Sequence, residues 1–231
     1  MIKTWMFKPY RNLPSTEHLV GYWPFNETSG TNAPDLSGNG NDGTLVNSPT
    51  WVDGVVGKCL DFDGTDEYVS IAASADFDFR DVSTSPFTLT AWVKPTTSRW
   101  NSVFSFGTIN YQSVSFAVNA SEQPTLTASA NGSSWTINYH TDSSISLNVY
   151  SLISLTRDTS GIYTFYINGE IVDSLTYSTD ILLNNYSVKV GGHYSLSAGA
   201  QFVGNIDEVR IYDTALTASE IKALYDYPGG V

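Results

Sequence analysis

The strongest constraint on the fold is a two-residue alternation that recurs in short segments along most of the chain. In "FTLTAWVKP" (87–95) an apolar residue occupies every second position from Phe87 to Val93, and Pro95 ends the run. This period is typical of a half-buried β-strand. Comparable segments follow at 102–107, 113–120, 124–140, 150–158, 163–175, 184–193 and 202–213. Short strands at regular intervals predict an all-β sandwich or barrel.

Turn signals support this interpretation. Asn131-Gly132 interrupts the segment 124–140, and Asn168-Gly169 interrupts 163–175. Both residue types tolerate positive φ, so each pair predicts a β-hairpin turn.

One helix is predicted near the end of the chain, in "ALTASEIKALYDY" (215–227). Thr217 and Glu220 have the spacing of a capping box, and Leu216 and Ile221 that of a hydrophobic staple. We expect a short helix lying across one end of the sandwich.

Composition restricts the function. The chain has 231 residues, 11 basic side chains and a net charge of −12. Binding of nucleic acid requires clustered Lys and Arg, so the charge argues against it. No segment has the length of a membrane span, and "MIKTWMFKPY" is too short an apolar stretch for a signal peptide. The sequence therefore predicts no membrane insertion and a place outside the cell or on a virion surface.

Several motifs carry a family resemblance that runs from about residue 18 to residue 226. They are "DLSGNGNDGTL" (35–45), "LDFDGTDEYVS" (60–70), "FTLTAWVKP" (87–95), "YTFYINGEIVDS" (163–174) and "FVGNIDEVRIYDTALTASEIKALY" (202–225). In this combination the chain resembles the laminin-G-like, concanavalin A-like lectin/glucanase domains. The resemblance implies an all-β jelly-roll sandwich of two antiparallel sheets with a short C-terminal helix. It divides the chain into an arm (1–17), the sandwich (18–227) and a tail (228–231).

The resemblance also implies a structural Ca²⁺ between the 35–45 loop and the closing strand. Asp35, Asn26 and Asp207 are the expected ligands, since Ca²⁺ binds carboxylate and carbonyl oxygens. Asn26 stands where relatives often carry Asp, which removes one negative charge. In the alternative interpretation Asp35 only caps a turn, and Asp207 and Glu208 are solvated strand ends.

A carbohydrate site would require exposed aromatic rings with polar neighbours. Trp135 and Tyr139 are two positions of one predicted strand that share a face, and Trp100 lies in a polar loop. The expected ligand-binding residues are Trp100, Tyr111, Trp135, Tyr139, His140 and Tyr194. The alternative for each ring is burial in the core.

Catalysis is not expected. The E-x-D-x-x-E spacing of hydrolases with this fold does not occur, and the three histidines lack companions at lyase motifs. The sequence favours a non-catalytic carbohydrate-binding or adhesion module whose partner is a glycan or a surface polysaccharide. The alternatives are a structural protein of a viral particle that binds protein partners and, less favoured, a glycoside hydrolase or polysaccharide lyase.

The arm 1–17 holds Trp5, Phe7 and Tyr10 together with Lys3, Lys8 and Arg11, which make it the most basic stretch of the chain. We expect it either to fold back on its own sandwich or to dock on a virion or on a second copy of the chain.

Overall fold

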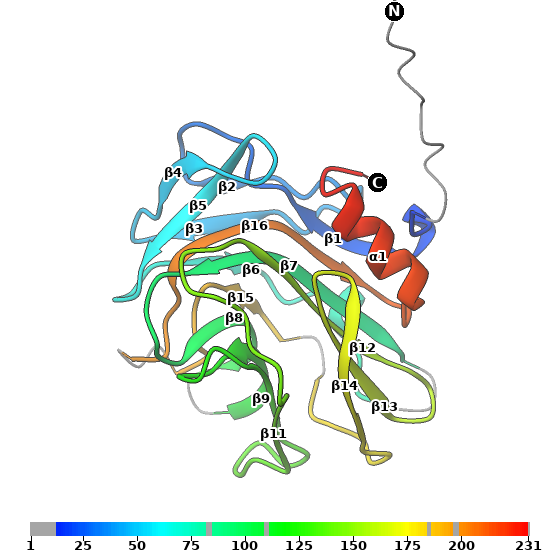
Figure 1. The fold of residues 1–231 in the computed structure, drawn as a ribbon. Helices are drawn as coiled ribbons and strands as arrows, with labels where there is room; N and C mark the ends of the chain where they lie inside the picture. The colour runs from blue at the N-terminus through cyan, green and yellow to red at the C-terminus, as the bar shows by residue number, and fades with distance from the viewer. Residues whose placement is uncertain (1–12, 82–84, 109–110, 184–185, 196–198, 231) are drawn as a thin grey trace, which may run out of the picture.

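The computed structural model describes residues 13–81, 85–108, 111–183, 186–195 and 199–230. Two antiparallel sheets pack face to face (Figure 1). Sheet A has the order β14-β13-β12-β7-β16-β5-β4, and β1 also pairs with β16. Sheet B has the order β11-β10-β9-β8-β15-β6-β3-β2. The predicted two-sheet sandwich is confirmed.

The strands of sheet A are β1 (Leu19–Trp23), β4 (Thr50–Asp53), β5 (Lys58–Asp63), β7 (Phe87–Pro95), β12 (Ser151–Arg157), β13 (Ile162–Ile167), β14 (Glu170–Thr176) and β16 (Val203–Tyr212). Those of sheet B are β2 (Asn32–Ala33), β3 (Gly43–Val46), β6 (Tyr68–Ile71), β8 (Asn101–Thr108), β9 (Tyr111–Val118), β10 (Pro124–Ala128), β11 (Ile137–His140) and β15 (Val188–Val190). Short 3₁₀ turns span Thr16–His18 and Ala75–Phe77.

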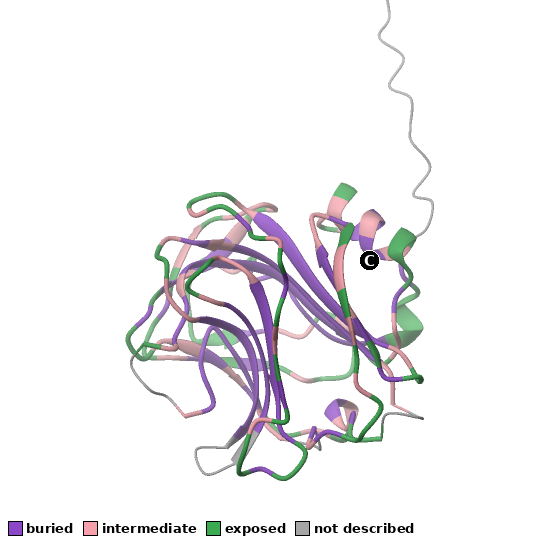
Figure 2. Cartoon of the chain, turned by 60° about the horizontal axis from the view of Figure 1, so that its bottom comes forward, coloured by how far each residue is buried: buried purple, intermediate pink, exposed green. Residues whose placement is uncertain are grey.

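The core lies between the sheets, and the alternating apolar residues of both fill it. Phe104 and Phe116 of sheet B stack with ring centroids 6.5 Å apart, and Phe116 reaches Phe165 of sheet A at 6.4 Å. Buried residues follow the strands of both layers, whereas exposed residues concentrate in the connections (Figure 2).

The predicted helix is α1 (Ala218–Asp226), and its capping box between Thr217 and Glu220 is present. It covers the outer face of sheet A (Figure 1), where Leu216 and Ile221 join a second apolar cluster with strand residues. Tyr225 stacks on Trp92 of β7 with centroids 5.4 Å apart. Sheet A therefore has little of its outer face free at this end. None of the helices in the described ranges is long and apolar enough to cross a membrane.

The two predicted hairpins differ. Between β13 and β14, Asn168 and Gly169 both adopt positive φ (53° and 84°), as a two-residue turn requires. Between β10 and β11 the connection is longer, at 129–136. There the Asn131 side chain accepts hydrogen bonds from the backbone N–H groups of Ser133 and Ser134. This local capping replaces the tight turn that Asn-Gly suggested.

Leu13, near the end of the predicted arm, packs against the apolar cluster under α1. The rest of the arm, up to residue 12, lies outside the described residues.

Candidate ligand site

A row of polar side chains crosses the outer face of sheet B. Residues that are cross-strand partners lie on the same face of a sheet. The register pairs Thr44 with Ser70, Ser70 with Lys189 and Lys189 with Ser105, and the same pairing continues to both edges of the sheet. We call this set the polar row: Asn32, Thr44, Ser70, Lys189, Ser105, Ser115, Thr127 and Asn138. The residues on either side of it along each strand, such as Phe104 and Phe116, point into the core. The row therefore faces outward.

Three hydroxyl groups in the middle of the polar row are buried without a partner. Ser105 Oγ, Ser115 Oγ and Thr127 Oγ1 form no hydrogen bond within the described part of the chain. Buried polar atoms are nearly always hydrogen-bonded, because an unmade bond costs about 1–3 kcal/mol. These three hydroxyl groups therefore give this face of sheet B hydrogen-bonding capacity that no described residue uses.

Aromatic side chains form a cavity over one end of the polar row. Its volume is about 220 Å³, and it is lined by Trp100, Thr127, Trp135, His193, Tyr194 and Ala200. Trp135 and Tyr194 meet edge to face with centroids 5.8 Å apart, and His193 lies 4.2 Å from the Tyr194 ring. The cavity thus combines ring faces with Thr127, whose hydroxyl oxygen is buried and has no partner among the described residues.

Connections from different parts of the chain position these rings. Trp100 precedes β8 and its Nε1 donates to Ser102 Oγ at 3.2 Å. Next to it, Asn101 Nδ2 donates to the carbonyls of Thr97 and Arg99, which fixes the loop. Trp135 lies in the β10–β11 connection, which Asn131 caps.

His193 follows β15 and is held on two sides. Its backbone N–H donates to Gln201 Oε1 at 2.8 Å, and its Nδ1 lies 2.7 Å from Ser195 Oγ. Burial, and next the nearby charge of Lys189, lower the pKa of His193 to about 4. The imidazole is therefore neutral near pH 7, and its ring can both donate and accept hydrogen bonds.

Three of the predicted ligand-binding residues meet at this cavity: Trp100, Trp135 and Tyr194. His140 is exposed on the edge strand β11 and does not line the cavity. The side chain of Tyr111, the first residue of β9, lies outside the described part.

The predicted platform of Trp135 with Tyr139 does not form. Strand β11 begins at Ile137, so Trp135 lies in the preceding connection and does not follow the alternation of the strand. Ile137 is in the core, and Tyr139 packs against core Phe165 with centroids 5.5 Å apart. Tyr139 is thus on the core side, whereas Trp135 lines the cavity.

Sequence reasoning missed Thr127, His193 and the rest of the polar row. The alternation in "PTLTA" and "SVSFA" was a usable signal, because it separates outward polar positions from inward apolar ones. It could not show which of these positions are neighbours, since that depends on the register of strands far apart in the sequence.

The predicted metal ligands divide between two places. Asp35 organises its own loop: its carboxylate accepts hydrogen bonds from the N–H groups of Tyr22, Ser37 and Asn41 and from the Ser37 hydroxyl. This is the turn-capping role that was the alternative to calcium. All four hydrogen bonds go to groups of β1 and the 35–45 loop.

Asn26 and Asp207 both hold the turn 54–58. Asn26 Oδ1 accepts from the N–H of Lys58 at 2.8 Å, and Asp207 Oδ2 accepts from Val55 and Val56 at 2.6 and 3.2 Å. Asp207 Oδ1 is buried and has no hydrogen-bond partner among the described residues. Burial raises the pKa of Asp207 to about 7, although the Val56 and Val55 N–H groups oppose the shift.

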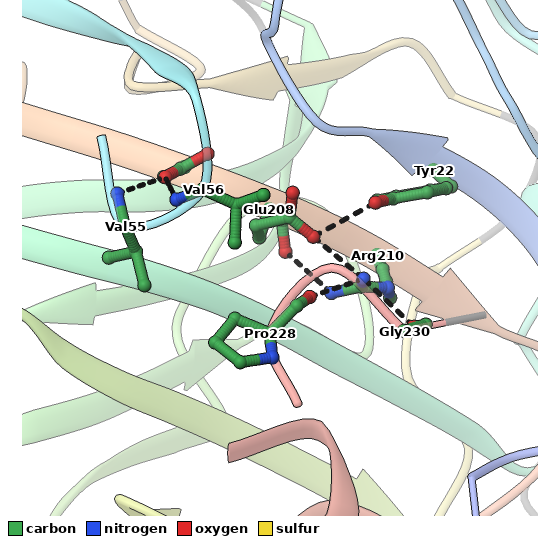
Figure 3. A network of polar contacts seen from close by, with 8 residues as sticks. Tyr22, Val55, Val56, Glu208, Arg210, Pro228 and Gly230 are labelled. Atoms are coloured by element: carbon green, nitrogen blue, oxygen red, sulfur yellow. Dashed lines mark hydrogen bonds and ion pairs between the residues drawn. The ribbon is translucent and has the colours of Figure 1, made fainter. Parts of the chain in front are cut away.

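Next to Asp207, a buried polar network ties the closing strand to both ends of the fold (Figure 3). Arg210 Nη2 lies 2.7 Å from Glu208 Oε2, which also accepts from the Tyr22 hydroxyl at 2.9 Å. Arg210 donates further to the carbonyls of Pro228 and Gly230. Glu208 and Arg210 are fully buried, so the solvated strand end that was considered for Glu208 is excluded.

A bulge in β16 explains why two acidic residues lie side by side. The pairing with β7 shifts between Asp207 and Arg210, and Glu208 has φ +52°. Ile206 and Val209 face the core on either side of the bulge. The inserted residue therefore leaves Asp207 and Glu208 together on the helix-covered side of sheet A.

In the described ranges no group of three or more His, Cys, Asp or Glu side chains is placed to hold a metal ion. Any cation at the 54–58 turn would thus be held by at most two such side chains of the described ranges, Asp207 among them, together with neutral oxygens. The free Oδ1 of Asp207 and the Oδ1 of Asn26 fit that role, whereas Asp35 does not contact this turn.

Solved structures share the fold. The binding domain of Paraclostridial Mosquitocidal Protein 1 superposes with a TM-score of 0.73 at 18% identity, over 91% of this chain and 52% of that one. Domain 4 of AbnA, a GH43 extracellular arabinanase from Geobacillus stearothermophilus solved with arabinotriose, superposes with a TM-score of 0.71 at 22% identity. The match covers 90% of this chain and 98% of that domain. The botulinum neurotoxin serotype D binding domain superposes with a TM-score of 0.70 at 11% identity. The match covers 91% of this chain and 52% of that one.

This chain therefore spans about half the length of the two toxin binding domains but nearly all of the arabinanase domain. At these identities the likeness shows the fold alone. No curated protein matches the sequence. The model of one family matches residues 63–222, which is more than half of the chain and includes β7, the β13–β14 hairpin and β16. Sheet order, capped helix and family match agree, and the chain belongs to the concanavalin A-like lectin/glucanases superfamily.

Proposed function

We propose that this protein is a carbohydrate-binding module whose ligand enters the aromatic cavity on the outer face of sheet B. The observation that carries the proposal is the juxtaposition of Trp100, Trp135 and Tyr194 with the unpartnered hydroxyl of Thr127. Sugar rings stack on aromatic faces, and their hydroxyl groups both donate and accept hydrogen bonds. A sugar can therefore use both kinds of surface that this cavity offers.

The polar row favours binding over hydrolysis. Hydrolysis of a glycosidic bond requires a pair of carboxylates on either side of it. The eight side chains of the polar row are hydroxyls, amides and one ammonium group. The arabinotriose complex of AbnA domain 4 supports a glycan as the partner of this fold. An extracellular localisation of this protein fits the same proposal, because that arabinanase is extracellular.

The first test is a glycan screen followed by calorimetry. We expect weak binding of single sugars, with a Kd on the order of millimolar, because a small cavity buries few groups. Trp135→Ala should weaken binding at least about tenfold, since a stacked ring contributes on the order of 1.5 kcal/mol. Ile171→Ser is the matched control: Ile171 is 58% exposed on β14 of the other sheet.

A Trp135→Ala variant that binds as the native protein does would contradict the proposed site. If no glycan binds at all, the protein-partner alternative replaces the proposal. Release of reducing ends or unsaturated uronates from polysaccharides would show that the protein is an enzyme after all.

We also propose a structural Ca²⁺ at the 54–58 turn, held by Asp207 and Asn26. At saturating Ca²⁺ the melting temperature should rise by about 3–8 °C over the value in EDTA, as ligand linkage of a few kcal/mol predicts. Asp207→Asn should abolish the response. Asp35→Asn should lower stability but keep the response, because Asp35 contacts a different loop. A melting curve that is the same in EDTA and in Ca²⁺ would refute the calcium proposal.

A further inference from the structure

Lys189, in the middle of the polar row, is a cation without a counter-charge. Of the seven other lysine and arginine residues in the described ranges, four face a carboxylate: Lys58, Arg80, Arg210 and Lys222. Lys189 forms no ion pair with any described residue. Its ammonium lies 5.9 Å from the centre of the Tyr68 ring.

The described cross-strand neighbours of Lys189 carry hydroxyl groups and no acid. Its cross-strand neighbours are Ser70 and Ser105, and the Ser105 hydroxyl is buried without a partner. Only 9% of the Lys189 surface is exposed. Burial lowers the pKa of Lys189, and no ion pair with a described carboxylate opposes the shift.

Lys189 is linked to the cavity in two ways, although it does not line it. Its charge acts on His193, which lines the cavity, and lowers the pKa of that imidazole. Thr127 belongs both to the polar row and to the cavity lining. A ligand that fills the cavity and also reaches Lys189 would therefore contact both aromatic rings and an ammonium group.

The free-energy cost of a mostly buried Lys189 ammonium group without a paired carboxylate requires a physical reason. A partly desolvated ammonium group is unfavourable unless something compensates its charge. In a chain with a net charge of −12 carboxylates are plentiful, yet none is placed here. A neutral sugar would gain nothing from a cation that a neutral hydrogen-bond donor could not supply, whereas an anionic ligand would complete the missing ion pair.

We infer that the ligand of this site is an acidic sugar, whose carboxylate pairs with the Lys189 ammonium while its ring or a neighbouring residue stacks in the aromatic cavity. This inference rests on the proposed function and narrows it to one substrate class. A uronic acid and a sialic acid both carry the required group.

The test compares acidic glycans with their own methyl esters, which differ only in that the carboxylate is neutral. The probes are trigalacturonic acid, a glucuronic acid oligomer and sialyllactose, each with its ester, measured by calorimetry on the full chain. For at least one pair we expect the acid to bind about tenfold more tightly than the ester, as for a hydrogen bond to a charged group. Added salt should reduce the difference.

Variants assign the preference to one side chain. Lys189→Met keeps the apolar stem and should remove the preference for the acid while the ester binds as before. Lys189→Arg keeps the charge and should keep the preference. Lys222→Met, which removes an exposed lysine of α1, is the matched control and should change neither affinity. The melting temperature of each variant shows whether it is folded.

The outcomes separate the two proposals. If acids and esters bind equally, or if Lys189→Met keeps the preference, the acidic-sugar inference is wrong but carbohydrate binding stands. If neither acids nor esters bind and neutral glycans fail as well, the proposed function fails and the inference fails with it.

Discussion

Arg210→Met should lower the free energy of unfolding by about 3–5 kcal/mol, because it leaves the Glu208 carboxylate buried without its counter-charge. Both side chains are fully buried, and their closest polar atoms are 2.7 Å apart. The variant also removes the hydrogen bonds to the carbonyls of Pro228 and Gly230 and the contact of the guanidinium with the Tyr22 ring, 4.2 Å from its centroid. Urea unfolding followed by tryptophan fluorescence measures the loss.

The size of the effect depends on burial, and two variants test this. Lys222→Met breaks an ion pair whose side chains are 38% and 46% exposed, and it should cost less than about 0.5 kcal/mol. Glu208→Gln combined with Arg210→Met removes both charges and should recover part of the loss. Equal costs for the buried and the exposed pair would show that the Glu208–Arg210 network does not stabilise the fold as inferred.

Gly204→Ala should destabilise the protein by more than about 3 kcal/mol. Gly204 lies in β16 with φ +123°, a conformation that residues with a Cβ rarely adopt. A Cβ there would stand 2.2 Å from the carbonyl oxygen of Lys94, in the neighbouring strand β7. The clash is with the backbone of the paired strand, where β16 begins and β7 ends, so a side-chain rotation cannot relieve it.

Gly30→Ala separates the two causes. Gly30 also has positive φ (+97°), but a Cβ there would meet no atom within 4 Å. This variant should cost only the conformational strain, about 1–2 kcal/mol. The difference between the two variants, measured by urea unfolding at equal m-values, is the steric contribution. Equal costs would mean that β16 and β7 can separate at this point without loss.

The sequence by itself determined the layers of this protein. Alternation of the kind seen in Phe87–Pro95 fixes which residues of a strand face the core, because its period matches the pleat. The Thr217–Glu220 capping box fixes where the helix begins, since the contacts involved are local. Asn168-Gly169 likewise determines its turn, because both residues adopt the left-handed conformation without help from distant contacts.

Only the tertiary structure decided where the site lies. Trp100, Trp135 and Tyr194 come from three separate connections, and their meeting depends on how sheet B pairs. The polar row exists because the register places Ser105, Ser115 and Thr127 side by side, and alternation within one strand carries no information on register. The same holds for Glu208, since the bulge that turns it beside Asp207 arises from pairing with β7. The alternation within a strand determines which side chains face the core and which face outward. The pairing of strands that are far apart in the sequence determines which of these side chains are neighbours, and a binding site is made of neighbouring side chains.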